Sequence, residues 1–279
     1  VIRGDLLRMD AAGSGADWYQ GTDYTNPEHL EKMRQSVRNM INEFKDEPYI
    51  LMWMLGNESN YGEVGNPDPA SNYAGMGSNA KKQPEAHYKF VNEVAGMIKT
   101  MDSNHPVGFS NGEVVTIDIL AKHSDNIDIL GANVYRGAFG FGTSFWQDAQ
   151  TFMDKPVVFT EYGCPAHVLG KDQNFAEQKQ MEYHQGNWED ILHNTAGSGF
   201  GNAIGGVAFE FVDEWWKSGL PPKFSAKEQE TVGDFVAAFP DGWMHEEWLG
   251  VTSQGDGSQS PFLRQLRKVY DYYKKVWNE

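Results

Sequence analysis

The chain has 279 residues, of which 40% are hydrophobic and 13% aromatic, enough to bury a core well beyond the minimum for independent folding. Its formal net charge of −16 would repel nucleic acid and anionic membranes, so we expect neither as a partner. The single cysteine excludes an intrachain disulfide framework, and no apolar run is long enough to predict a membrane span.

Six short apolar runs predict strands. The runs are continuous and not alternating, which is typical of parallel strands that are buried on both faces. In chain order they are residues 1–7, 49–55, 107–110, 127–133, 157–161 and 204–211.

Amphipathic patterns between these runs predict helices. In the first, Asn26 is the expected N-cap, Pro27 takes the first helical position, and Pro48 follows the end. The segment 84–101 repeats this scheme. Further helices are predicted around 172–193 and at 261–277.

Alternating strands and helices predict a parallel α/β sheet. A closed (β/α)8 barrel, or TIM barrel, needs eight strands, whereas six are visible here. We therefore expect a TIM barrel with strands 3–8 in this chain, and with its first two strands upstream of Val1 or supplied by a second chain. A complete open doubly wound sheet is the alternative, but no phosphate-binding glycine fingerprint supports it.

Long loops rich in glycine, asparagine and aromatic residues follow four of the predicted strands. They are residues 10–25, 59–83, 134–146 and 212–260. In a barrel, the active site lies on the face that carries such loops. None resembles an interdomain linker, so we expect a single domain over residues 1–279, with 212–260 as an insertion after the last strand.

Two glutamates stand where apolar runs give way to polar sequence: Glu58 in "MLGNESNYG" and Glu161 in "VVFTEYGCPA". Two carboxylates that approach to about 5–5.5 Å suit retaining glycoside hydrolysis, in which one attacks the anomeric carbon and the other protonates the departing oxygen. Taken alone, an Asn-Glu pair after a strand is more often a helix cap or a surface pair. The occurrence of both motifs at strand ends is the stronger signal.

The two segments resemble those of a known group. "WMLGNESNYG" is similar to the acid/base segment of clan A retaining glycosidases, in particular the β-galactosidase and β-glucuronidase family, and "VVFTEYGCPA" resembles their nucleophile segment and that of fungal β-1,3-glucanosyltransferases. "DILGANVYRG" and "GGVAFEFVDEWW" resemble strands six and eight. The resemblance implies that Glu58 is the acid/base and Glu161 the nucleophile, that Tyr135 hydrogen-bonds the nucleophile, and that Asn57 contacts the sugar 2-hydroxyl.

Further residues are candidates for substrate binding. They are Asn133, Phe209, Glu210, Trp215 and Trp216. Phe209 stands where the family has a stacking tryptophan, a role that Trp215 or Trp216 could take instead. Glu210 belongs to an acidic patch that either recognises sugar hydroxyls or is structural.

Two other sites have less support. Cys164 and His167 lack the context of a cysteine hydrolase, and Glu113 either lines the cleft or caps a helix. The scattered histidines and acidic residues form no metal motif, so we expect no cofactor and no catalytic metal.

The expected function is therefore that of a retaining β-glycosidase. It would hydrolyse or transglycosylate neutral β-linked glucans or oligosaccharides through a covalent glycosyl-enzyme, and such substrates favour an exported location. The alternatives are a non-catalytic carbohydrate-binding protein on an inherited barrel and one fragment of a two-chain glycosidase.

Overall fold

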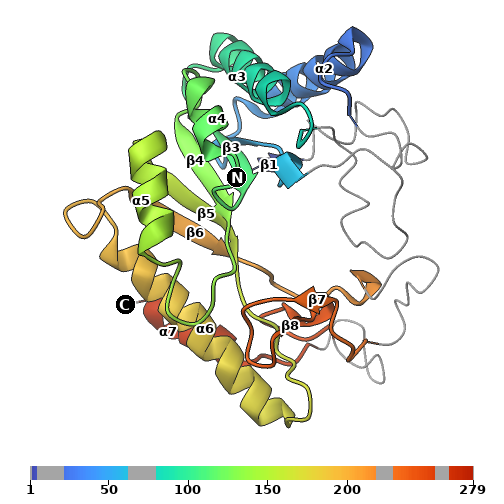
Figure 1. Ribbon diagram of the computed structural model, residues 1–279, viewed down its shortest axis with the longest axis vertical. Coiled ribbons are helices and arrows are strands. Elements are labelled where there is room, and N and C mark those ends of the chain that lie inside the picture. The colour runs from blue at the N-terminus through green and yellow to red at the C-terminus, as the bar shows by residue number, and fades with distance from the viewer. Residues whose placement is uncertain (1, 5–21, 62–79, 218–228, 255–263, 279) are drawn as a thin grey trace. The chain divides into compact units, whose positions relative to one another are not determined.

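The computed structural model describes residues 2–4, 22–61, 80–217, 229–254 and 264–278, although not the side chains of residues 2–4, 61 and 216 (Figure 1). The chain divides into two compact units, and each is described by itself. The first comprises residues 1–133, 144–158 and 202–204, and the second comprises 134–143, 159–201 and 205–279. The expected single domain stays a prediction. None of the described helices combines the length and apolar character needed to cross a membrane.

A six-stranded sheet contains the strands in chain order, from β1 to β6. They are β1 (Ile2–Gly4), β2 (Trp53–Leu55), β3 (Val107–Gly112), β4 (Ile129–Asn133), β5 (Val157–Tyr162) and β6 (Ala203–Ala208). Pairing is parallel from β1 to β4. The backbone N–H of Leu130 then donates to the carbonyl of Pro156, and that of Val157 to the carbonyl of Asn202, which continues the order to β6. All six predicted strands are therefore confirmed, with bounds that differ by a few residues.

The apolar runs explain where these strands lie. Every residue of β2 to β5 is buried, as expected for a parallel sheet covered on both faces. Met52, Met54, Ile129 and Val158 form one core cluster in the first unit. In contrast, the prediction of full burial is wrong for β6, because Ile204 and Val207 are about half exposed, at 50% and 48%. The physical reason is its place at the end of the strand order.

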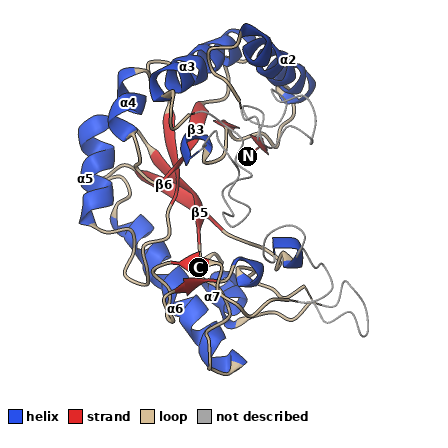
Figure 2. Cartoon of the chain, turned by 45° about the vertical axis from the view of Figure 1, so that its right-hand side comes forward, coloured by secondary structure: helices blue, strands red, loops and turns tan. Residues whose placement is uncertain are grey.

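Helices lie along the outer side of this sheet in the first unit (Figure 2). They are α2 (Pro27–Phe44), α3 (Pro84–Met101), α4 (Ile117–Lys122) and α5 (Thr143–Phe152). As predicted, Pro27 begins α2 and the Asn26 side chain caps it, accepting from the backbone N–H of Glu28 at 2.9 Å. Met33, Val37 and Ile41 form its buried face. The first two helices match the predicted ranges, whereas α4 and α5 lie where no helix was expected.

The second unit contains two helices and a small hairpin. Its helices are α6 (Gln173–His193) and α7 (Lys268–Val276), and its hairpin pairs β7 (Phe235–Val236) with β8 (Trp243–Met244). Short 3-10 turns are η4 (Trp215–Lys217) and η5 (Glu246–Trp248) here, and η2 (Ser59–Tyr61) in the first unit. The described residues of the predicted 212–260 insertion thus carry regular structure.

The predicted last helix is too long. Residues 264–267 are not helical, and α7 begins at Lys268, because Leu266 forms a bridge with Thr252 and Arg267 turns inward. Residues 261–263 lie outside the described part of the chain.

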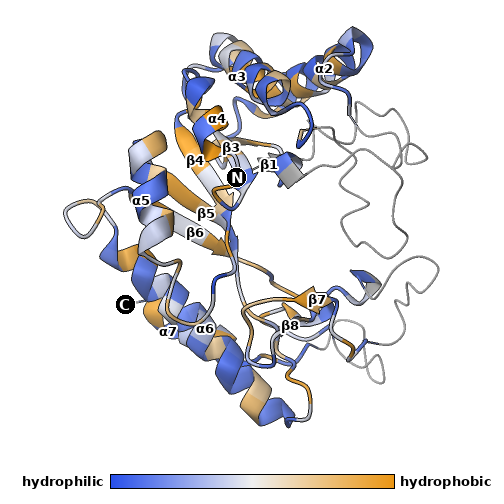
Figure 3. Cartoon of the chain, viewed as in Figure 1, coloured by the Kyte–Doolittle hydropathy of each residue, from blue (hydrophilic) through white to orange (hydrophobic). Residues whose placement is uncertain are grey.

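The core of the second unit is assembled from segments far apart in sequence. It contains Cys164, Phe239, Met244 and Leu249, with Tyr135, Tyr183 and Phe209 packed against them. Hydrophilic and hydrophobic residues are mixed along α6 (Figure 3). This cluster supports the carboxyl end of β5 and the segment after β6.

Candidate active site

Glu58 follows β2 through a tight turn. Gly56 has a φ of +65°, and a Cβ there would lie 3.0 Å from both Phe109 Cε2 and Ser59 Oγ, so the turn requires glycine. Glu58 itself has a φ of 50°, a conformation that is uncommon for a residue with a side chain. Its backbone N–H donates to the carbonyl of Ser110 at 3.1 Å. The turn places Asn57 and Glu58 at the carboxyl end of the strand.

Asn133, the last residue of β4, brings three of the predicted site residues together. Its Nδ2 donates to Glu58 Oε1 at 2.9 Å and to Asn57 Oδ1 at 3.2 Å. Asn133 is only 2% exposed, whereas Asn57 and Glu58 are partly exposed. The first unit therefore holds a carboxylate and an amide at one strand end, supported by a buried amide.

Glu161 and Tyr135 meet in the second unit. Glu161 lies on β5 and is 8% exposed, and the phenol of Tyr135 donates to its Oε2 at 2.9 Å. The backbone N–H of Val134 also donates to the carbonyl of Glu161 at 2.9 Å, which aligns the two segments. This is the hydrogen bond that the resemblance implies for Tyr135. It fixes the orientation of the Glu161 carboxylate.

Phe209 lies just beyond β6 and is covered on one face. The ammonium of Lys217 lies 4.4 Å from the centroid of the Phe209 ring, within the range of a cation–π contact. Lys217 also pairs with Glu214 at 2.9 Å. One face of the Phe209 ring is therefore occupied by a cation, and the role of Phe209 in substrate binding stays a prediction.

Carboxylates surround Lys217 and shift the protonation of one another. Burial raises the pKa of Glu210 to about 9, and the neighbouring Glu214 adds to that effect. Burial also raises the pKa of Glu246, with a further contribution from the charge of Glu161. Burial by itself would lower the pKa of Lys217, but Glu246, Glu210 and Glu214 outweigh it, so that this pKa is raised. Glu210 and Glu246 therefore hold their protons more tightly than exposed glutamates do, and Lys217 stays cationic.

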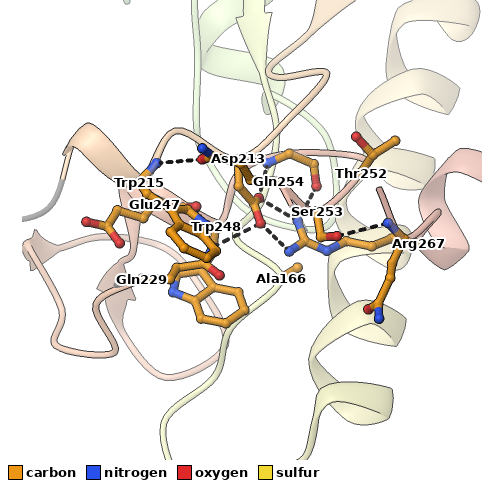
Figure 4. Close-up of polar contacts among 12 residues, drawn as sticks. Ala166, Asp213, Trp215, Gln229, Glu247, Trp248, Thr252, Ser253, Gln254 and Arg267 are labelled. Carbon is orange, nitrogen blue, oxygen red and sulfur yellow. Dashed lines mark hydrogen bonds and ion pairs between the residues drawn. The ribbon is translucent and has the colours of Figure 1, made fainter. Parts of the chain in front are cut away.

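A buried ion pair anchors the segment that follows β6 (Figure 4). The Arg267 guanidinium donates to both oxygens of Asp213, at 2.7 and 2.6 Å, and both side chains are almost fully buried. Gln229 Nε2 and the backbone N–H of Gly250 donate to the same carboxylate, at 2.9 and 3.0 Å. Trp215 follows two residues later, and its backbone N–H donates to Gln254. The side chain of Trp216 lies outside the described residues.

Sequence reasoning missed the contributions of Lys217 and Arg267. Lys217 stands three residues after Glu214, a spacing at which opposite charges on a helical turn meet, so a local signal was present. Arg267 carried no such signal, because its partner is 54 residues away.

Cys164 and His167 both lie in packed surroundings of the second unit. Cys164 is fully buried, and burial raises the pKa of its thiol well above the ordinary value. The His167 ring packs against His245 and Trp248. Among the described residues, no three of the histidine, cysteine and acidic side chains are grouped to hold a metal.

Comparison with known proteins finds glycosidases. The family model for "Glycosyl hydrolases family 2, TIM barrel domain" matches residues 11–225. Mannan endo-1,4-beta-mannosidase 1 of Solanum lycopersicum is 25% identical over 191 residues, which cover 54% of this chain and 44% of that protein.

Two solved structures show the same fold. The beta-D-glucuronidase of Dictyoglomus thermophilum has a TM-score of 0.55 at 15% identity, covering 91% of this chain and 36% of that one. The beta-galacturonidase of Eisenbergiella tayi bound to galacturonate has a TM-score of 0.57 at 15% identity, covering 91% and 37%. The expected TIM-barrel fold is confirmed, and the chain spans less than half the length of each of these three relatives.

Proposed function

Because the chain belongs to the TIM-barrel domain of the family 2 glycosyl hydrolases, we propose that it carries the catalytic glutamates of a retaining β-glycosidase. The observation that carries this proposal is the pair of strand-end glutamates, each bonded to a side chain that orients it. Asn133 donates to Glu58 at 2.9 Å, and Tyr135 donates to Glu161 at 2.9 Å.

The proposed chemistry assigns a role to each carboxyl group. Glu161 attacks the anomeric carbon and forms a covalent glycosyl-enzyme, while Glu58 protonates the departing oxygen. Glu58 then takes a proton from the incoming water, or from a sugar hydroxyl in transglycosylation, as that nucleophile releases the sugar. Asn57 contributes an amide to the sugar 2-hydroxyl.

We propose a neutral sugar in the substrate. The negative charges of Glu161 and Glu214 both contribute to the raised pKa of Glu246, and the cation of Lys217 is already paired with Glu214. A uronate would bring another negative charge into this environment, which costs free energy at low effective dielectric. The glucuronidase and galacturonidase are named for acidic sugars, whereas the mannosidase is named for a neutral one. The neutral class is favoured here because the cation of Lys217 is already paired with Glu214. A β-linked glucan or another neutral β-linked oligosaccharide fits this proposal.

The decisive experiment is to trap the intermediate. The natural protein is incubated with 2-deoxy-2-fluoro-β-glycosyl fluorides of glucose, mannose and galactose, and the labelled peptide is mapped by mass spectrometry. We expect one sugar on Glu161, and loss of the label in Glu161→Gln. Label on another residue, or sugar binding without any covalent adduct or product release, would contradict the proposal and favour a binding protein.

Kinetics on p-nitrophenyl β-glycosides complete the test. Glu161→Gln and Glu58→Gln should each lower kcat/KM by several orders of magnitude on the preferred neutral glycoside. Glu43→Gln and Glu189→Gln, which alter exposed helical glutamates in the same two units, should retain wild-type rates. A p-nitrophenyl β-glucuronide should be the poorest substrate of the panel.

A further inference from the structure

Asn133 is held at the end of β4 by hydrogen bonds of both its side chain and its backbone. Its Oδ1 accepts from the hydroxyl of Ser110 at 3.4 Å, and its backbone carbonyl accepts from the N–H of Glu113 at 3.1 Å. Ser110 is fully buried, and Asn133 is 2% exposed. With so little surface of its own, Asn133 acts on a ligand through the residues that it touches.

The Nδ2 group of Asn133 serves two acceptors with different chemistry. One is the carboxylate of Glu58 and the other is the amide oxygen of Asn57. Because its oxygen is engaged in this way, Asn57 offers a ligand its N–H donors. A donor to an ionised carboxylate stabilises the charged form over the protonated one.

We propose that Asn133 is a positioning residue that fixes Asn57 and Glu58 relative to each other and stabilises the carboxylate form of Glu58. This inference rests on the proposed function. It gives Asn133 a role in the step in which Glu58 must accept a proton from water. It also fixes the orientation of the Asn57 amide, so that the amide oxygen faces Asn133 and the N–H groups are left for the sugar 2-hydroxyl.

The test is the pH dependence of kcat/KM on the preferred aryl β-glycoside. The alkaline limb of this pH profile reports the pKa of the essential acid, here Glu58, in the free enzyme. In Asn133→Ala, loss of the donor should move this limb upward by about one pH unit, the size expected for a hydrogen bond to a charged group. In Asn133→Asp, which places a carboxylate beside Glu58, the limb should move further upward.

Asn111→Ala is the matched control. Asn111 is another fully buried asparagine of the same unit, near the end of β3. Its side chain accepts from the phenol of Tyr88 and donates to the backbone carbonyls of residues 112, 113 and 115. Its loss should lower stability while leaving the alkaline limb in place. The acidic side chain of Glu113 is unchanged in all of these variants, so its charge cannot produce a difference between them.

A direct titration keeps the test independent of catalysis. The protein is labelled with ¹³C at the glutamate carboxyls, and the Glu58 signal is identified by its absence in Glu58→Gln. Its midpoint should rise in Asn133→Ala and more in Asn133→Asp. Unchanged midpoints and limbs in folded variants would overturn the inference, even if Glu58→Gln abolishes activity. Full activity of Glu58→Gln would instead overturn the proposed function.

Discussion

The phenol of Tyr135 donates a hydrogen bond of 2.9 Å to Oε2 of Glu161, and the backbone N–H next to Tyr135 donates to the carbonyl of the same glutamate. The segment after β4 and the strand β5 are thus joined at both side-chain and backbone level. These two hydrogen bonds restrict the orientation of the Glu161 carboxylate.

Removal of the Tyr135 hydroxyl should therefore affect rate more than stability. We expect Tyr135→Phe to lower kcat/KM by about 10- to 100-fold, the equivalent of one hydrogen bond to a charged group. Steady-state kinetics and thermal unfolding measure the two effects. Tyr270→Phe, on α7, is the control that should leave both unchanged. A wild-type rate in Tyr135→Phe would show that Glu161 needs no help from the phenol.

Gly186 in α6 should not tolerate alanine. In most helices this change stabilises the protein by about 1 kcal/mol, because glycine has the larger backbone entropy in the unfolded chain. Here a Cβ would collide with the backbone carbonyl oxygen of Ala138. We expect Gly186→Ala to lower the free energy of unfolding by about 1–3 kcal/mol.

Chemical denaturation measures this effect, with Glu189→Ala on the exposed side of α6 as the neutral control. An increase in stability in Gly186→Ala would show that residues 137–139 move away freely.

Glu210 should make the protein less stable as the pH rises. Its pKa is raised by burial from 4.5 to about 9, so the folded state holds this proton more tightly than the unfolded chain does. The stabilisation is complete below pH 4.5 and is lost as the pH rises towards 9. Glu210→Gln should remove this loss, so that the stability difference between variant and wild type grows in favour of the variant from pH 5 to pH 9.

Denaturant unfolding at several pH values measures the difference in free energy of unfolding between Glu210→Gln and the wild type. Because other titrating groups are the same in both proteins, the difference reports Glu210 alone. A difference that is constant from pH 5 to 9 would mean that Glu210 is already ionised at pH 5.

The buried Asp213–Arg267 pair should be costly to break. Arg267→Met leaves the Asp213 carboxylate buried without its cation, and we expect a loss of about 3–5 kcal/mol in the free energy of unfolding. The double variant with Asp213→Asn should recover part of that loss because the charge is removed. Arg38→Met removes an exposed pair with Glu31 and should cost at most about 1 kcal/mol. Equal effects of the two arginine substitutions would contradict the assignment.

Much of the fold could be predicted because it is encoded locally. The buried strands are continuous apolar runs, and α2 carries its own start signal in Asn26 and Pro27. The start of α7 could not be predicted, since a helical pattern extends to residue 261 and only the distant Asp213 shows why Arg267 lies outside the helix. Similarly, nothing in a local pattern distinguishes the two-residue strands β7 and β8 from loop.

For the candidate site, too, some residues are marked by local sequence and others are brought in only by packing. The sequence singles out Glu58 and Glu161 because each stands at the end of an apolar run, and the resemblance predicts the hydrogen bond of Tyr135 to Glu161, which the structure contains. The contact of Asn133 with Glu58 joins residues 75 positions apart, and the ammonium of Lys217 reaches the ring of Phe209 from a separate turn. Such contacts depend on how strands and turns pack, which no spacing in the sequence reveals.

The burial of Cys164 gives the second unit a native reporter of its own opening. It is the only thiol in the chain and is 0% exposed, and burial raises the pKa of its thiol. A thiol reagent can therefore modify Cys164 only when local unfolding exposes the core. The labelling rate thus measures how often this unfolding occurs, without any introduced probe.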